Sequence, residues 1–254
     1  MINSLLVKAY TADRTACIGL PPIRAAEAQT LYDVLSGDPI LNRIFLLSLA
    51  AACFAQSAKT VVENDHVKVL SVVAQPHQKT REHDHKINRV MIYLTAGSQD
   101  ITYVGGKKNS TSWRANEAKW SPATGMHVAE ITSAEPVTII EVELKKPAPA
   151  AAKPTGPMDP VKLDPNHYKV AFENSQVRVL DVLIGGKEAV PMHEHTRDRV
   201  VVYATDMEFL ITAADGKATP ASHKAGDAAF STYAKHKEDN LGGKPVRLVV
   251  VELK

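Results

Sequence analysis

The chain repeats itself over a length that only a duplicated domain explains. The segment HDHKINRVMIYLT at residues 83–95 returns as HEHTRDRVVVYAT at residues 193–205, an offset of 110 positions. After the loss of one residue, VELK at residues 142–145 recurs at 251–254. Each copy is therefore about a hundred residues long, well beyond the few tens of residues of a solenoid unit. We expect two domains with the same fold.

Composition excludes several classes of partner. The chain has 254 residues, of which 44% are hydrophobic and 23% charged, so it can bury two cores. Lys and Arg number 30 against 28 Asp and Glu, a net charge of +2. This balance provides no basic patch for nucleic acid, and the charges are too interspersed for a membrane surface patch. We expect neither partner.

An apolar segment near the start has the order of a secretory signal. It reads NRIFLLSLAAACFAQS from Asn42, with basic Arg43, an apolar stretch and small residues before a cleavage site after Ala55. The stretch is too short to span a bilayer. The sequence thus predicts a signal peptide over residues 40–55 and a periplasmic or secreted location.

About forty residues precede this signal, although a signal should begin the chain. We interpret residues 1–39 as an extension from a mis-assigned gene start, the alternative being a buried helix in a true N-terminal extension. Cys17 and Cys53 are the only cysteines. Both lie in the part expected to be removed, which leaves no thiol in an oxidising compartment.

A proline-rich stretch separates the copies. KKPAPAAAKPTGPMDPVKLDP holds too many prolines for a helix interior or a sheet ladder. It predicts a semi-rigid extended connector over residues 147–165. The two domains then cover residues 56–146 and 166–254.

Both copies have the pattern of strands. Residues 66–73 and 176–184 are rich in branched aliphatic side chains with partial alternation. RVMIYLT and RVVVYAT, which follow the histidine pairs, are apolar on both faces, as in a sandwich or a filled barrel. Neither copy shows sustained helical periodicity. The sequence therefore predicts an all-β protein of two barrels.

The histidines and their surroundings resemble the two-part motif of the cupins, a histidine pair H-x-H with a later glycine, then a Pro/Gly segment with a third histidine. The matching residues are His83, His85, Gly97, Pro122, Gly125 and His127 in the first copy, and His193, His195, His236 and Asn240 in the second. The chain is thus similar to a bicupin, with two tandem cupin-like jelly-roll β-barrels. The resemblance implies that the three histidines of each copy hold a divalent transition metal in the barrel mouth.

The chain departs from the cupin pattern at one ligand position in both copies. Arg89 and Arg199 stand where cupins usually place a metal-binding glutamate. Arginine stays protonated and cannot be a ligand. The first copy also has Ile131 where the motif has an asparagine.

The residues themselves support part of this chemistry. Histidines two apart on a strand share a face, and imidazole is the commonest metal ligand. Iron, manganese, nickel and zinc all remain possible, and so does a site with no metal.

The arginines favour a bound anion, because guanidinium pairs with carboxylate or phosphate through two hydrogen bonds. By strand parity, Tyr93 shares the face of Arg89 and Tyr203 that of Arg199, so both tyrosines are candidate substrate-binding residues. The alternatives are core packing for the tyrosines and salt bridges for the arginines. The acidic residues considered for these bridges are Asp84, Glu194 and Asp198.

Three functions agree with the sequence. The first is a metal-dependent enzyme, such as an oxygenase or isomerase, that acts on a small anionic molecule. The second is a metal-free module that binds a small acid through Arg89 and Arg199. The third is a bicupin with a structural role only, since the fold hosts unrelated activities. The two barrels are expected to pair within the chain, and a homo-oligomer remains possible.

Overall fold

The computed structural model describes residues 57–146 and 155–254. The strands of the first copy are β1 (Ser57–Glu63), β2 (Val67–Ala74), β3 (His83–His85), β4 (Arg89–Tyr93), β5 (Gly97–Tyr103), β6 (Lys108–Trp113), β7 (Glu117–Ser121), β8 (Thr124–Ile131) and β9 (Val137–Leu144). Those of the second copy are β10 (Tyr168–Glu173), β11 (Val177–Ile184), β12 (Ala189–His195), β13 (Arg199–Tyr203), β14 (Met207–Ala213), β15 (Ala218–His223), β16 (Ala228–Ser231), β17 (Ala234–Asn240) and β18 (Val246–Leu253). The predicted extension (1–39) and signal peptide (40–55) lie outside the described residues.

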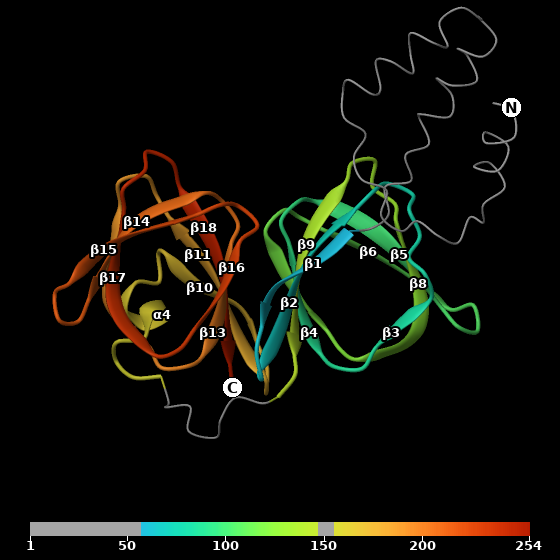
Figure 1. The fold of residues 1–254 in the computed structure, drawn as a ribbon, viewed down its shortest axis with the longest axis horizontal. Helices are drawn as coiled ribbons and strands as arrows, with labels where there is room; N and C mark the ends of the chain where they lie inside the picture. The colour runs from blue at the N-terminus through green and yellow to red at the C-terminus, as the bar shows by residue number, and fades with distance from the viewer. Residues whose placement is uncertain (1–56, 147–154) are drawn as a thin grey trace, which may run out of the picture. The chain divides into compact units, whose positions relative to one another are not determined.

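Each copy forms two antiparallel sheets with the same strand order. The orders are β1-β2-β9-β4-β7 and β3-β8-β5-β6 in the first copy, and β10-β11-β18-β13-β16 and β12-β17-β14-β15 in the second. Figure 1 shows the strands of each copy wrapping into a barrel. The prediction of an all-β fold with two tandem jelly-roll barrels is confirmed.

The duplication extends to local geometry. A β-bulge in β1 between Thr60 and Val62 recurs at the equivalent place in β10. The Asn64 side-chain oxygen accepts hydrogen bonds from the backbone N–H groups two and three residues later, at 2.8 and 2.9 Å. Asn174 repeats both bonds at 2.8 and 3.0 Å. Asparagine favours such turns because its side chain imitates a backbone acceptor.

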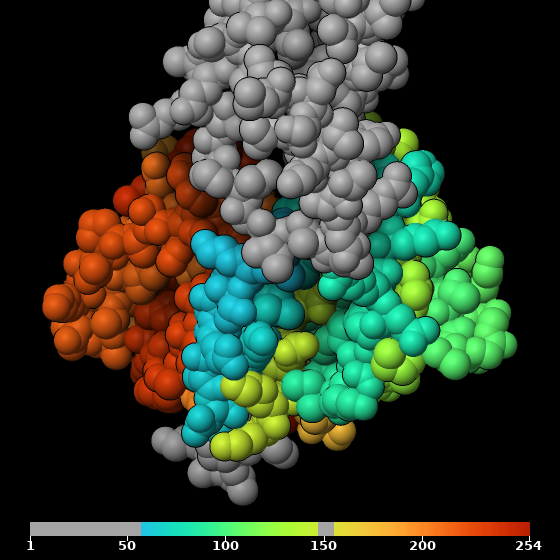
Figure 2. Space-filling view, turned by 45° about the vertical axis from the view of Figure 1, so that its right-hand side comes forward, coloured from blue at the N-terminus to red at the C-terminus, as the bar shows by residue number. Residues whose placement is uncertain are grey.

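A buried aliphatic cluster joins the two copies and is built from equivalent residues of each. Its members are Val67 and Val177, Val69 and Val179, Val90 and Val200, Ile92 and Val202, Ile140 and Val249, Val142 and Val251, and Leu144 and Leu253. Strand β1 also contacts β16, and in Figure 2 the blue residues of the first barrel adjoin orange and red residues of the second. This is the self-complementary pairing expected of a duplicated chain.

Part of the predicted connector is helical and not extended. Helix α4 (Pro160–Leu163) begins after Asp159, whose side chain accepts a hydrogen bond from the Val161 N–H at 3.1 Å. Proline is tolerated here because the first residue of a helix needs no N–H partner. The helix contacts β10 and β12, so this segment belongs to the second barrel. No helix among the described residues is long and apolar enough to cross a membrane.

Candidate metal centres

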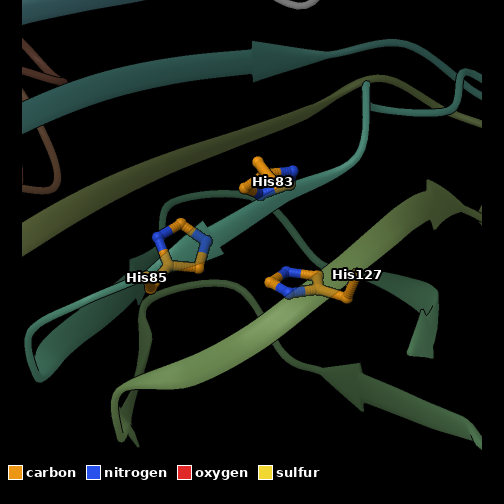
Figure 3. A group of neighbouring side chains, drawn as sticks. All are labelled: His83, His85 and His127. Carbon is orange, nitrogen blue, oxygen red and sulfur yellow. The ribbon is translucent and has the colours of Figure 1, made fainter. Parts of the chain in front are cut away.

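The first barrel brings His83, His85 and His127 together. The first two share a face of β3, and His127 on β8 lies directly opposite His83 in the strand pairing. One ligand nitrogen from each ring lies within 4.8 Å of the others. Figure 3 shows the three rings facing a common space. The structure therefore assembles this predicted triad from two strands separated by about forty residues of chain.

Backbone carbonyls fix two of these rings. Nδ1 of His83 lies 2.8 Å from the Arg81 carbonyl oxygen, and Nδ1 of His127 lies 2.8 Å from that of Gly125. A carbonyl accepts only from an N–H, so Nδ1 carries a proton in both rings, and Nε2 is the atom that each neutral ring presents to a metal. Such anchoring is typical of metal-binding histidines.

Arg89 lies against the third ring. Its NH1 atom is 2.9 Å from Nε2 of His85 and 2.8 Å from Oε2 of Glu141 on β9, and NH2 donates to Oγ of Ser121 at 3.1 Å. Asp84, one of the acids considered as an alternative salt-bridge partner, pairs with Lys86. Arg89 does form a salt bridge, but with Glu141 on a neighbouring strand.

Burial shifts the pKa values of two groups in this site. Burial, followed by the positive charge of Arg89, lowers the pKa of His85 to about 3, so the ring is neutral near pH 7. Burial also raises the pKa of Glu141, although Arg89 opposes this shift. Glu141, Arg89 and the triad line a cavity of about 70 Å³. The sequence analysis missed Glu141, whose only signal is a carboxylate inside the apolar strand VTIIEVEL.

The second barrel gathers His193, His195 and His236 in the same way, and all three are buried. His236 pairs directly with His193 across β12 and β17, and the ligand nitrogens again lie within 4.8 Å of one another. Nδ1 of His193 lies 2.9 Å from the Pro191 carbonyl oxygen, which repeats the anchor of the first copy.

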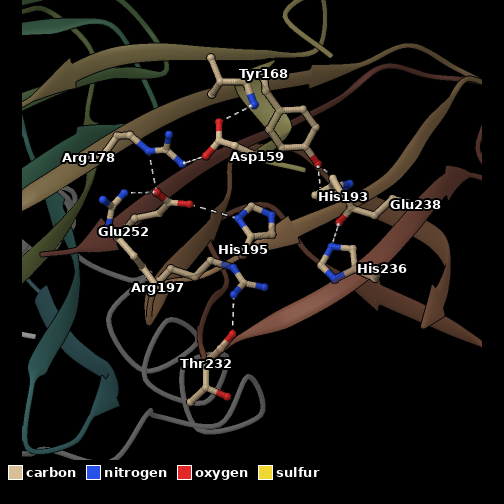
Figure 4. Close-up of polar contacts among 12 residues, drawn as sticks. Asp159, Tyr168, Arg178, His193, His195, Arg197, Thr232, His236, Glu238 and Glu252 are labelled. Atoms are coloured by element: carbon tan, nitrogen blue, oxygen red, sulfur yellow. Dashed lines mark hydrogen bonds and ion pairs between the residues drawn. The ribbon is translucent and has the colours of Figure 1, made fainter. Parts of the chain in front are cut away.

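A series of buried charged residues holds His195 through its Nδ1 atom, on the side of the ring away from the triad's ligand nitrogens. Its Nδ1 lies 3.2 Å from Oε1 of Glu252, whose other oxygen accepts from Nε of Arg178 at 2.7 Å. NH2 of Arg178 in turn donates to Asp159 at 2.6 Å, which ties the start of α4 to the site (Figure 4). Burial alone would raise the pKa of Glu252, but His195 and Arg178 outweigh it and lower the pKa to about 2. The sequence analysis identified none of these three supporting residues.

A carboxylate enters this cavity from β17. Oε2 of Glu238 accepts from the Tyr168 hydroxyl at 2.6 Å, and Oε1 lies 3.5 Å from Nε2 of His236. Burial opposes ionisation of Glu238, but its partners, led by His236, lower the pKa to about 2. The remaining space is about 30 Å³.

The two arginines occupy equivalent positions but have different partners. Arg199 lines the second cavity and is buried, yet its NH1 donates to the Thr232 carbonyl oxygen at 2.5 Å. The alternative bridges from Arg199 to Glu194 or Asp198 are not found among the described residues. Glu194 instead accepts from the Tyr233 hydroxyl.

Both candidate tyrosines lie in the core and do not line the cavities. Tyr93 stacks on Trp113 with ring centroids 4.1 Å apart, and Tyr203 stacks on His223 at 3.8 Å. The cavity walls contain Met91 but not Tyr93, because strand parity fixes the face of a residue and not its depth in the barrel. Their role as substrate-binding residues stays a prediction. Burial raises the pKa of each hydroxyl to about 12.

The donor sets fit a divalent transition metal. Three neutral imidazoles with open positions are typical of catalytic metal sites. In the second barrel, Nε2 of His236 is buried with no hydrogen-bond partner, although it lies within ion-pair range of Glu238. A buried polar atom without a hydrogen-bond partner is costly, and a cation bound to the ring nitrogen would satisfy it.

Comparison with known proteins supports the fold. No protein-family model matches the sequence, and no curated protein matches it. Among solved structures, oxalate decarboxylase from Bacillus subtilis matches with a TM-score of 0.54 and 13% identity, over 78% of this chain and 72% of that one. AerE from Microcystis aeruginosa matches with a TM-score of 0.54 and 14% identity, over 78% of this chain and 98% of that one.

These likenesses show the fold. The chain has the cupin fold in duplicate, as the histidine motif indicated. On this bicupin-like fold lie two metal-capable histidine triads, each beside an arginine.

Proposed function

We propose that this bicupin holds a divalent transition metal through three histidines and binds or transforms a small anionic molecule. One observation carries the proposal: in each barrel three histidine nitrogens lie within 4.8 Å of one another. Backbone carbonyls hold two rings in the first barrel and one in the second through Nδ1, which leaves Nε2 as the ligand atom of the neutral ring. Iron, manganese, nickel and zinc all suit such a donor set.

The chemistry would combine the metal with residues of the chain. A bound metal supplies a Lewis acid with open positions for a substrate oxygen, as in an oxygenase or an isomerase. Arg89 and Arg199 line the cavities and would attract and orient an anion. The barrel walls, including Met91 and Ile139, exclude water and so strengthen these interactions. A small carboxylate agrees with the name of the oxalate decarboxylase neighbour.

A second candidate is a metal-free module that binds a small acid. It is favoured by the bond from Arg89 to His85, in which a cation already occupies a histidine of the first triad. Its cavity of about 70 Å³ has room for a few water-sized groups.

Elemental analysis of the full chain, purified without tag or chelator, tests the proposal. We expect bound transition metal in the wild type and its loss in the double variant His83→Ala/His193→Ala. A protein that binds no metal, yet retains binding of a carboxylate ligand by calorimetry, would support the metal-free module instead.

Export is a separate part of the proposal and depends on the signal predicted over residues 40–55. N-terminal sequencing of the natively expressed protein tests it. A mature chain that begins near Gln56 supports export, whereas one that retains residues 1–39 contradicts it.

A further inference from the structure

The bond between Arg89 and His85 affects the ligand position of the first triad. A guanidinium has only donors, so the lone pair on Nε2 of His85 must accept from NH1. His83 and His127 are anchored through Nδ1 and present Nε2. The same nitrogen of His85 would complete a three-histidine site, and Arg89 already uses its lone pair.

Glu141 keeps the guanidinium in this place. Its Oε2 accepts from the NH1 atom that also contacts His85, while Ser121 accepts from NH2. The side chains of Arg89 and Glu141 are only 7% and 12% exposed. A metal in this triad would therefore lie beside a fixed, buried positive charge and would have to displace one of its hydrogen bonds.

The second barrel lacks this arrangement because of one exchange of residues. Val250 on β18 stands at the position equivalent to Glu141, and both residues line their cavities. Without that carboxylate, Arg199 donates to the Thr232 carbonyl oxygen. No bond from Arg199 to His195 is found within residues 155–254.

In the second triad the Nε2 atoms are available to a metal, whereas in the first triad Arg89 occupies that of His85. His195 donates from Nδ1 to Glu252, which leaves its Nε2 lone pair available. Nε2 of His236 is buried without a hydrogen-bond partner, and the carboxylate of Glu238 lies 3.5 Å from it. The Tyr168 hydroxyl lies 3.4 Å from Nε2 of His193, but it gives its hydrogen to Glu238. Three ring nitrogens with an adjacent carboxylate therefore favour a cation.

We infer that the chain binds one divalent transition metal ion, in the second barrel, and that Arg89, held by Glu141, keeps the first triad free of metal. The inference rests on the proposed function, since it assigns the metal to one of two similar sites. Arg89 and Glu141 are thus residues that determine metal selectivity between the barrels.

Cobalt binding to the full chain tests the inference. Chelator-treated protein is titrated with Co²⁺, and stoichiometry is read from elemental analysis and from the visible absorption of the bound ion. The variants are His83→Ala, His193→Ala, the double variant Arg89→Gln/Glu141→Gln and the matched control Arg199→Gln. The double change removes both charges of the buried pair together, and circular dichroism confirms that each variant is folded.

We expect one cobalt per chain in the wild type, in His83→Ala and in Arg199→Gln, none in His193→Ala, and two in the double variant. Two ions per wild-type chain, or one ion that is lost in His83→Ala and kept in His193→Ala, would overturn the inference while leaving the proposed metal function intact. No cobalt in any folded variant would contradict both.

Discussion

The two barrels share their fold and their histidines but differ in what surrounds the triads. In the first barrel His83 and His85 are partly exposed, and an arginine contacts the triad from the side. In the second barrel all three histidines are buried, and a carboxylate behind His195 is fixed by Arg178 and Asp159. A few exchanged residues have therefore given two copies of one scaffold different electrostatic environments.

The difference arises from carboxylates placed on different strands. Glu141 on β9 is matched by Val250, whereas Glu238 on β17 is matched by Ala129. Each barrel thus has one acid in the cavity, but the first acid pairs with the arginine and the second with Tyr168 and His236. The position of the acid decides whether the arginine faces the triad, because a buried guanidinium needs a partner.

The largest expected effect is on stability and concerns Arg178. Its change to Met leaves Asp159 buried without its cation and Glu252 with only the longer contact to Arg197 at 3.5 Å, so we expect a loss of about 3–5 kcal/mol in the free energy of unfolding. The equivalent residue of the first barrel is Lys68, which is partly exposed. Lys68→Met should change stability by less than about 0.5 kcal/mol. Urea unfolding followed by circular dichroism measures the stability of both variants. Equal losses would show that the contacts of Arg178 with Asp159 and Glu252 give the second barrel no stability that the first lacks.

Removal of one hydroxyl in the second cavity should have a smaller effect. Tyr168 donates to the ionised Glu238 at 2.6 Å, so Tyr168→Phe should cost about 1.5–3 kcal/mol of stability, as for a hydrogen bond to a charged group. Tyr93→Phe is the matched control, because the ring of Tyr93 stacks on Trp113 and this contact needs no hydroxyl. The same urea titration applies, and a Tyr168→Phe variant as stable as the control would refute the importance of this bond.

Only those features that depend on the spacing of nearby residues in the chain could be predicted from the sequence. The duplication identified the barrels and the two H-x-H pairs identified four histidines, while the second part of the cupin motif supplied His127 and His236. Partners on distant strands could not be found, because no spacing in the chain relates Glu141 to Arg89 or Asp159 to Arg178. Sequence neighbours of the arginines were considered first, whereas Arg89–Glu141 and Arg178–Glu252 form between neighbouring strands of one sheet that lie far apart in the sequence.

The hydrogen bond that Glu252 accepts from His195 should also affect the affinity for metal. Glu252→Gln weakens the acceptor that orients His195, and we expect about a 10- to 100-fold weaker affinity for Co²⁺. Glu143 is the equivalent residue of the first barrel, and Glu143→Gln should leave the affinity unchanged if the metal lies in the second. Competition with a chromophoric chelator gives both constants. A larger loss in Glu143→Gln would reverse the assignment of the barrels.

The smallest expected effect depends on pH and again belongs to the second barrel. His167 lies between two acids, with Nδ1 2.6 Å from Asp164 and Nε2 3.0 Å from Glu188. Burial opposes protonation, but these two hydrogen bonds outweigh it and raise the pKa of His167 above 6.5. The first barrel has Ser57 at this position.

Because the folded-state pKa is raised, this stabilisation is fully present below pH 6.5 and is lost as the pH rises through the higher folded value. Glu188 is more than half exposed, so solvent screening limits the effect to about 0.5–1 kcal/mol. We expect His167→Gln to destabilise the protein by this amount at pH 6 and by less at pH 9, measured by urea unfolding at both values. Glu188→Gln should reduce the same pH dependence, and a His167→Gln effect that is constant between pH 6 and pH 9 would show that the imidazole contributes through packing and not through its charge.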